Sequence, residues 1–440
     1  MAVNAELMAR LSRYGIAALG PLSVAASQFL LSFILLRQLD VADFGRFAFL
    51  LIVSQFSTSL WSALFTAPLL VAAARSGTAR NMADIRALAA SSSLALLPGT
   101  LLFAGLTYRL GGDWGAAALF GMWSAVALLR HFLRAWFLAH QRPLLTMASD
   151  LSYALALQVA LVIAMAIHGP DFRQTGMLLL AAASCGLLPF LTRLAGVRTV
   201  RFRLGDIAGY RPIWQRDGRW SLIGVIATEL TVNSQSYLVT MLSGAKAFAP
   251  IAATALLVRP VTVAINALGE FERARFAHGL EEGRPAEVQK ARGQLRSTLL
   301  LAWLATLLLA ALLLHFAPDF LFHGKFAGPV LWTGAALWFA VIFARAFHGP
   351  DDAVLLAMGQ FRRLARLSSI TAILSLLAVA GLIMLAGPLW SIAGIAIGEG
   401  VFALFLYKEA GARLKWQLQS RSSSGPASDA TMVLVTARRD

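Results

Sequence analysis

Residues Ser297–Ala317 read STLLLAWLATLLLAALLLHFA, and His315 is the one ionisable side chain among these 21 positions. A helix needs about 20 mainly apolar residues to cross the hydrocarbon core of a bilayer. Phe47–Ala74 and Ala87–Leu106 supply comparable apolar length elsewhere in the chain. Long apolar runs therefore alternate with short polar gaps, and this alternation predicts a chain that crosses a membrane many times.

The composition supports the same conclusion. Of the 440 residues, 58% are hydrophobic and 14% are charged, and the mean hydropathy is +0.69. These values lie far from the usage of a soluble domain. We predict an all-α, polytopic integral membrane protein with twelve transmembrane helices in two six-helix bundles.

Twelve spans can be placed along the sequence. The expected ranges are Tyr14–Leu36, Phe47–Ala74, Ala87–Leu110, Ala116–Leu138, Met147–His168, Met177–Val197, Trp220–Ser243, Ala249–Phe271, Ser297–Ala317, Gly328–Phe347, Leu367–Gly387 and Leu389–Tyr407. They define an N-terminal bundle over 1–197, a basic cytoplasmic linker over 198–219 and a C-terminal bundle over 220–415. The remaining residues, 416–440, have the composition of a disordered cytoplasmic tail.

The basic residues predict the orientation. Arg259 lies within a span, and the other Lys and Arg are distributed very unevenly between alternate gaps. One set of gaps holds only six of them: Arg37, Arg46, Arg109, Arg173, Lys246 and Lys325. Loops rich in Lys and Arg face the cytoplasm, so both termini are expected to be cytoplasmic. The net charge of +16 then reflects contact with anionic lipid headgroups, and no nucleic-acid partner is expected.

The two halves carry a weak internal repeat. Leu39–Ala48 follows the first span and Leu242–Ala252 follows the seventh, and both contain a leucine, a short polar turn and a Phe-small pair. Because the two segments occupy corresponding hairpins, they favour a parallel six-plus-six repeat.

Several segments resemble a known transporter family. Leu35–Ala48, with the pattern Asp43-Phe44-Gly45-Arg46, resembles the opening of polysaccharide and oligosaccharide flippases (Wzx-like) of the multidrug/oligosaccharidyl-lipid/polysaccharide exporter superfamily. Val239–Gly283, Ala357–Phe361 and Gly387–Gly394 are similar to later parts of the same family. The resemblance covers roughly residues 8–415, as a pattern without one diagnostic motif.

The resemblance implies two bundles around a central cavity, alternating access and a lipid-linked sugar as cargo. We expect a flippase that moves a polyprenyl-diphosphate-linked oligosaccharide, an exopolysaccharide or O-antigen repeat unit, to the outer leaflet. The expected partners are this lipid-linked substrate, the bilayer, and the polymerase and export machinery of polysaccharide assembly. The seventh span departs from the family, which often has an acidic residue where this chain has Asn233, Gln235 and Ser236.

Three ionisable residues fall near the middle of predicted spans: Glu229, Arg259 and Glu399. A charge at that depth costs about 2.5–3.5 kcal/mol on insertion scales, so such residues usually face a cavity or one another. Arg259 is a candidate to bind a diphosphate, with Glu229 as its partner or as a proton site. A structural Arg–Glu pair would explain both equally. Glu399 lies next to a Gly394–Gly398 pair whose spacing favours close helix packing.

Further substrate-binding candidates are polar residues within spans. Arg130 and Arg134 lie one helical turn apart, and arginine binds phosphate oxygens with two parallel hydrogen bonds. Arginines that extend to the inner headgroups would give the same pattern. Gln28, Gln55, Gln158 and Asn233 complete the set. Hydrogen bonds between helices explain the glutamines as well as sugar binding does.

The sequence lacks the usual enzyme signatures. There is no glycine-rich loop ending in Lys-Ser or Lys-Thr, no Gly-x-Ser-x-Gly elbow, and no histidine pair at metal-ligand spacing. We therefore expect neither an enzyme nor a bound metal or cofactor. Three alternatives stay open: an ion-coupled multidrug exporter of the same superfamily, a membrane enzyme of polysaccharide assembly such as a polymerase, and a scaffold subunit.

Overall fold

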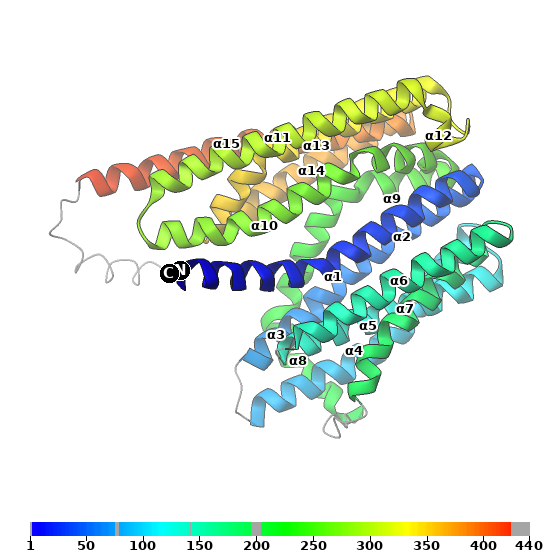
Figure 1. Cartoon of the computed structure of the whole chain (residues 1–440), viewed down its shortest axis with the longest axis horizontal. Coiled ribbons are helices and arrows are strands. Elements are labelled where there is room, and N and C mark those ends of the chain that lie inside the picture. Colours follow the sequence, from blue (N-terminus) through cyan, green and yellow to red (C-terminus); the bar gives the residue numbers. More distant parts are fainter. Residues whose placement is uncertain (1, 75–78, 141, 195–203, 424–440) are drawn as a thin grey trace. The chain divides into compact units, whose positions relative to one another are not determined.

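A computed structural model describes residues 2–74, 79–140, 142–194 and 204–423, and every regular element over those residues is helical (Figure 1). The α-helices are α1 (Ala2–Gln38), α2 (Val41–Trp61), α3 (Ala67–Ala74), α4 (Ala79–Arg109), α5 (Trp114–Ala139), α6 (Pro143–Ile167), α7 (Phe172–Leu194), α8 (Tyr210–Ile213), α9 (Arg219–Ala255), α10 (Arg259–Glu281), α11 (Pro285–Phe316), α12 (Pro318–Phe322), α13 (Gly328–Ala357), α14 (Phe361–Ala386) and α15 (Ser391–Ser423). Short π-helical and 3-10 segments join or interrupt them: η1 (Ser62–Thr66), η2 (Leu204–Gly209), η3 (Trp214–Gly218), η4 (Leu256–Val258) and η5 (Pro388–Trp390).

The number of membrane crossings agrees with the sequence. Among the described residues, 11 stretches are long and apolar enough to span a membrane. One of them, Ser221–Gly269, has 49 residues, which at about 1.5 Å per residue is more than twice the thickness of a bilayer core. Gly244 breaks the helix inside this stretch, with φ 81°, a value that glycine adopts readily. The stretch therefore holds two crossings, and the predicted all-α fold with twelve spans is confirmed.

The helices form two compact units. The first unit comprises Met1–Leu256 and Ala317–Gly328, and the second comprises Leu257–Phe316 and Pro329–Asp440. The sequence predicts a boundary at 198–219 because the longest and most basic gap between spans lies there, whereas the compact units group α9 with the earlier helices. The six-plus-six division remains a prediction about the repeat.

Two predicted segments look different in the structure. Residues 204–219 of the predicted linker form η2, α8, η3 and the start of α9. Residues 416–423 of the predicted tail continue α15. Residues 198–203 and 424–440 lie outside the described residues.

The α9 helix joins the first unit by packing against α2. At Gly45 the two helices approach so closely that a Cβ atom would overlap the carbonyl oxygen of Ala245 and lie 3.3 Å from the Cβ of Ala249. Gly45 and these alanines belong to the two repeated hairpin segments, so the repeat that the sequence indicates is also a packing contact.

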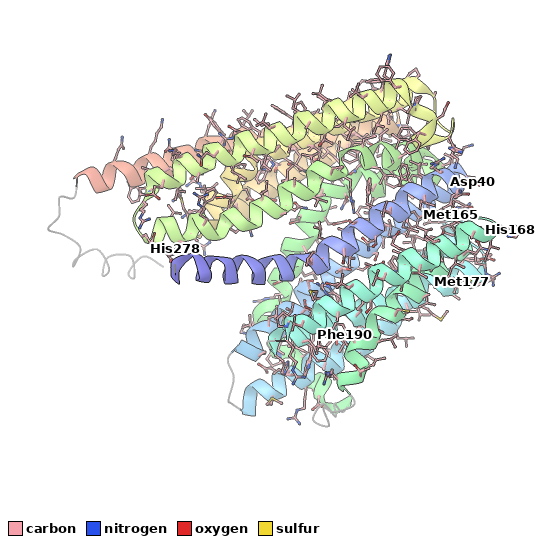
Figure 2. All side chains as sticks on the ribbon, viewed as in Figure 1. Asp40, Met165, His168, Met177, Phe190 and His278 are labelled. Atoms are coloured by element: carbon pink, nitrogen blue, oxygen red, sulfur yellow. The ribbon has the colours of Figure 1, made fainter. Side chains whose placement is uncertain are left out.

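Within the first unit, α1 packs on α6, α4 on α5, and α7 on both α5 and α6. Successive helices run in opposite directions: the turns at Asp40 and His168 lie at one end of the unit and Phe190 lies towards the other (Figure 2). A hydrophobic cluster that includes Phe65, Phe132 and Phe190 fills the space between α4, α5 and α7. This packing positions α5, the helix that carries Arg130 and Arg134.

The segment between α11 and α13 also belongs to the first unit. Lys325 Nζ donates hydrogen bonds to the carbonyl oxygens of Leu36 (2.9 Å), Arg37 (2.7 Å) and Leu39 at the end of α1. These carbonyls have no partner within the helix, so a cation stabilises them and the helix dipole. Burial lowers the pKa of Lys325, and the Asp40 carboxylate offsets part of this shift.

The second unit contains the close helix packing that the Gly394–Gly398 spacing predicts. A Cβ at Gly394 would lie 2.5 Å from the backbone nitrogen of Val379, and one at Gly398 would lie 2.6 Å from the Cβ of Ser375. Both glycines are on α15 and both contacted residues are on α14. Glycine is needed at these positions because α14 and α15 touch through their backbones.

Candidate functional site

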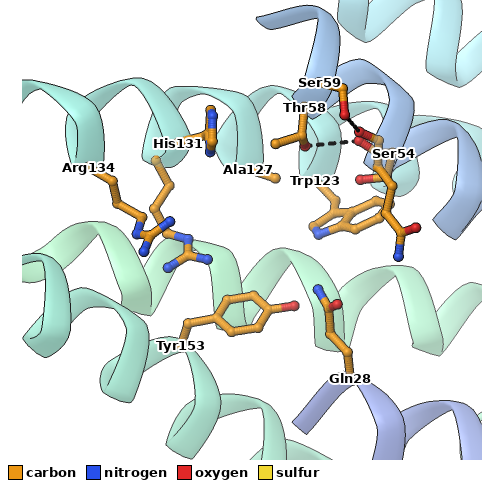
Figure 3. A pocket seen from close by; sticks show the side chains of 11 residues that line it. Gln28, Ser54, Thr58, Ser59, Trp123, Ala127, His131, Arg134 and Tyr153 are labelled. Carbon is orange, nitrogen blue, oxygen red and sulfur yellow. Dashed lines mark hydrogen bonds between the residues drawn. The ribbon is translucent and has the colours of Figure 1, made fainter. Parts of the chain in front are cut away.

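A polar pocket of about 390 Å³ lies inside the first unit, between α1, α2, α5 and α6 (Figure 3). The wall of the pocket has two chemically different parts. One part is cationic and aromatic, and the other is made of uncharged polar side chains and an indole. The lining residues are Gln28, Ser54, Gln55, Thr58, Ser59, Trp123, Ala127, Arg130, His131, Arg134 and Tyr153.

The cationic part is organised around one buried carboxylate. Asp150, on α6, accepts a hydrogen bond from Arg130 Nη1 at 2.9 Å and from Arg134 Nη2 at 2.8 Å. The Asp150 side chain is 2% exposed, against 12% for Arg130 and 24% for Arg134. Two guanidinium groups against one carboxylate leave the cluster with a net charge of +1, and the arginines rather than the aspartate line the pocket.

Local geometry dictates how these side chains meet. Arg130 and Arg134 are four residues apart on α5 and so project from the same face. On α6, the neighbouring Ser149 donates to the carbonyl oxygen of Gly186 at 2.6 Å, which anchors this turn of α6 to α7. The guanidinium of Arg130 also lies 4.6 Å from the centre of the Tyr153 ring, a distance at which cation–π attraction operates.

His131 is held in the pocket wall by an irregularity in the neighbouring helix. The π-helical segment η1 interrupts the helix that continues from α2 into α3. The hydroxyl oxygen of Ser62, the first residue of η1, lies 2.8 Å from Nε2 of His131. Such π-helical insertions occur often at functional sites. The Ser62 contact holds the imidazole in the pocket wall.

The uncharged part of the pocket offers hydrogen-bonding groups from two helices. Thr58 and Ser59 donate their hydroxyl protons to the carbonyls of Ser54 (2.9 Å) and Gln55 (3.1 Å) on their own helix. Their hydroxyl oxygens can still accept hydrogen bonds. The Gln28 amide lies beside the Tyr153 hydroxyl (Figure 3).

Trp123 belongs to the uncharged part of the pocket and is 2% exposed. Its ring is held from behind by edge contacts to Phe103 at 5.8 Å and Phe120 at 6.0 Å. An anion could therefore bind at the arginines while a hydroxyl-rich group lies against the amides and the indole.

The structure brings together four of the eight predicted substrate-binding residues. Arg130, Arg134, Gln28 and Gln55 all line this pocket. Gln158 instead donates from Nε2 to the backbone carbonyl of Ser27 at 3.3 Å and so ties α6 to α1. This is the interhelical hydrogen bond that the sequence offered as the alternative to sugar binding.

Glu229 and Asn233 meet on α9, away from the pocket lining. Asn233 Nδ2 donates to Glu229 Oε1 at 3.1 Å, and the Tyr237 hydroxyl donates to the same oxygen. Tyr237 packs edge-on against Phe49 and Phe56 of α2. The Glu229 carboxylate is thus stabilised by groups on its own helix.

Arg259 begins α10 in the second unit. Within that unit it has no ion-pair partner among the described residues. Its proposed pairing with Glu229 and its proposed contact with a diphosphate remain predictions.

The second unit has ionic clusters of its own. Asp351 on α13 is fully buried and pairs with Arg292 and Arg296 of α11, the latter at 2.8 Å. Glu399 on α15 accepts from Arg345 Nη2 at 2.7 Å and from His348 Nε2 at 3.0 Å. Arg292 and Arg296 both lie in α11, and both bind this buried carboxylate.

Sequence reasoning missed three important residues of the first unit. Asp150 lies four positions into a predicted span, and an acidic residue there was a usable signal. Trp123 also lines the pocket. Tyr153 carried no signal, since its role depends on a ring contact with an arginine of another helix.

Comparison with known proteins bears on the fold. No protein-family model and no curated protein matches this sequence. A solved structure described as the inward-facing conformation of a multidrug resistance MATE family transporter of the MOP superfamily is 13% identical, covers 93% of this chain and 96% of its own, and has a TM-score of 0.69. An outward-facing structure of such a transporter is 14% identical, covers 93% and 97%, and has a TM-score of 0.54.

A lipid II flippase, MurJ, in an inward closed conformation, is 9% identical, covers 90% of this chain and 87% of its own, and has a TM-score of 0.63. At these identities the likenesses concern architecture and not substrate. The chain has the helical membrane fold shared by MATE transporters and the lipid II flippase MurJ.

Proposed function

We propose that this protein is an alternating-access flippase that moves a polyprenyl-diphosphate-linked oligosaccharide from the cytoplasmic to the outer leaflet of a bacterial inner membrane. Both termini would be cytoplasmic. The observation that carries the proposal is the pocket, in which two arginines adjoin a wall of uncharged hydrogen-bonding groups. The fold supports it, since one structural neighbour is described as a lipid flippase.

The arginines have the donors that a diphosphate needs. A guanidinium carries five N–H groups, and Asp150 engages one terminal nitrogen of each arginine. The remaining N–H groups can bind phosphate oxygens, and such charge-assisted bonds are roughly twice as strong as neutral ones.

The uncharged wall suits the sugar that follows the diphosphate. Sugar hydroxyls both donate and accept hydrogen bonds, as do the Gln28 and Gln55 amides and the Ser and Thr hydroxyls of α2. The indole of Trp123 provides an apolar surface beside them. Arg259 is proposed to bind a phosphate, Glu229 to act as a proton site, and Asn233 to bind substrate.

A multidrug exporter of the same fold is the main competing function, because several neighbours are MATE transporters. The charge of the pocket opposes a cationic drug: its one acidic neighbour, Asp150, is buried behind two arginines. Sensitivity to cationic drugs in a deletion strain distinguishes the two functions.

The leaflet distribution of lipid-linked oligosaccharide tests the proposal directly. Spheroplasts of a deletion strain are labelled with an impermeant sugar-directed reagent, with and without the wild-type gene or Arg134→Gln. We expect precursor to accumulate on the inner face, and only the wild type to restore outward labelling. Normal outward precursor that fails to polymerise would replace the flippase with an assembly enzyme or a partner subunit.

A further inference from the structure

Asp150 has no direct access to a ligand, yet it is the group closest to both arginines of the pocket. Its side chain is 2% exposed and each of its oxygens accepts from a different guanidinium. We propose that Asp150 is a fixed counter-charge that weakens the hold of Arg130 and Arg134 on an anionic phosphate group, so that the flippase can release it. This rests on the proposed function and adds to it the residue that sets substrate affinity.

The argument begins with the charge of the cluster. With Asp150 ionised, the two arginines present a net charge of +1 to the pocket, and without it they would present +2. A unit charge about 6 Å from a bound phosphate, at an effective dielectric constant of about 20, changes a binding constant about 100-fold. Screening by water in the pocket reduces this, so we expect a change of about tenfold or more.

Asp150 is held where it cannot turn away from the arginines. On the α1 side, a Cβ at Gly20 would lie 2.7 Å from Asp150 Oδ2, so the backbone of α1 covers the carboxylate. Ser149 anchors the same turn of α6 to Gly186. Because the carboxylate is fixed, its repulsion is present whenever a phosphate enters and favours release at the end of the cycle.

A carrier needs such a limit on affinity, since a substrate bound too tightly in one conformation slows its own release. A purely structural role for Asp150 is the competing explanation, and the second unit supplies a matched control. Asp351 is likewise buried between two arginines four residues apart, Arg292 and Arg296, but these arginines are not among the residues that line this pocket.

The test uses the full-length protein in detergent and titrates farnesyl diphosphate by calorimetry. We compare the wild type with Asp150→Asn, Asp150→Glu, Asp351→Asn and Arg134→Gln. Asp150→Asn should bind about tenfold tighter or more, Asp150→Glu should resemble the wild type, and Asp351→Asn should leave the Kd unchanged. Arg134→Gln should bind more weakly, which tests the proposed function separately.

The rate of flipping is a second measurement. A purely structural role for Asp150 would not lower this rate while tightening the binding of the diphosphate. In proteoliposomes, Asp150→Asn should flip a fluorescent polyprenyl-diphosphate lipid several times more slowly despite its lower Kd. Unchanged or weaker binding by Asp150→Asn, while Arg134→Gln binds weakly, would overturn the role of Asp150 and leave the flippase standing. Equal shifts in Asp150→Asn and Asp351→Asn would also overturn it.

Wild-type binding by Arg134→Gln would instead overturn the proposed function itself. If Asp150→Asn does not fold, Asp150→Ser is titrated in its place, with the same expected increase in affinity. Failure of both variants to fold, while Asp351→Asn folds, would show that Asp150 is a brace and would overturn the proposal.

Discussion

Two clusters of the same composition occur in the two units, and their surroundings differ. In each, one buried aspartate pairs with two arginines four residues apart on a neighbouring helix. Around Asp150, the arginines line a polar pocket. Around Asp351, aromatic rings cover the arginines: Arg296 lies 4.7 Å from the ring of Phe347 and 5.1 Å from that of Tyr407.

The comparison teaches that a charge motif alone does not identify a binding site. Buried ion pairs contribute little net stability, but breaking one by removing a single partner is costly. In the second cluster Arg296 also donates to the carbonyl oxygen of Phe347 at 3.0 Å, while Arg292 Nη2 is buried without a hydrogen-bond partner among the described residues. We interpret the Asp351 cluster as a brace between α11 and α13, and the Asp150 cluster as part of a site.

The largest expected effect is a loss of stability at the brace. Asp351→Asn leaves two arginines with no carboxylate in aromatic surroundings, and we expect the free energy of unfolding to fall by about 3–5 kcal/mol. Asp150→Asn should cost clearly less, because Arg130 and Arg134 border a polar pocket. Thermal unfolding of both variants in the same detergent measures the difference. Equal losses of stability would remove the distinction between brace and site.

The second prediction concerns the arginines. Arg134→Gln retains the pair between Arg130 and Asp150 but removes charge-assisted donors from the pocket, and such bonds contribute about 1.5–3 kcal/mol each. We expect diphosphate binding to weaken about 10- to 100-fold with a small change in stability. Arg296→Gln should show the reverse pattern, a lower unfolding temperature with unchanged affinity. Calorimetric titration of both variants measures the diphosphate affinity, and thermal unfolding measures the stability.

The sequence predicts those features of the two units that depend on residues close together along one helix. It does not predict which side chains of different helices contact one another. The twelve spans and the contact at Gly394 and Gly398 follow from hydropathy and from spacing along one helix. Arg130 and Arg134 could be paired because they are one turn apart. Asp150 and Tyr153 could not be joined to them, since those contacts need the packing of α5 on α6. Trp123 lies seven residues before Arg130 on α5 and so shares the same face.

A pair of tryptophans sharpens the comparison at a smaller scale. Trp123 lines the pocket, whereas Trp303 of the second unit donates from Nε1 to the carbonyl oxygen of Phe339 at 2.9 Å. Trp303→Phe should cost about 1 kcal/mol of stability through the lost hydrogen bond and leave substrate affinity unchanged. Trp123→Phe should instead weaken binding of a sugar-bearing lipid several-fold but not that of farnesyl diphosphate. An equal effect on both ligands would exclude a sugar contact at Trp123.

The smallest predicted effect lies at the segment between α11 and α13, which belongs to the first unit although both helices that it joins belong to the second. Lys325 attaches this segment to the end of α1, and a ring contact between Phe320 and Phe33 at 5.9 Å supports it. Lys325→Met keeps most of the side chain but removes its three donors. Because burial already disfavours the ammonium, as its lowered pKa indicates, the net loss of stability should be only about 1 kcal/mol.

Protease cleavage of the native protein measures that loss locally. Cleavage between α11 and α13 should become several times faster in Lys325→Met, while cleavage at other sites keeps its wild-type rate. Arg173→Met is the matched control, because Arg173 is exposed and its pair with Asp113 is long, at 3.8 Å, and should leave the rate unchanged. Unchanged cleavage in Lys325→Met would mean that the aromatic contact alone holds the segment to the first unit, and Phe320→Ala would then release it.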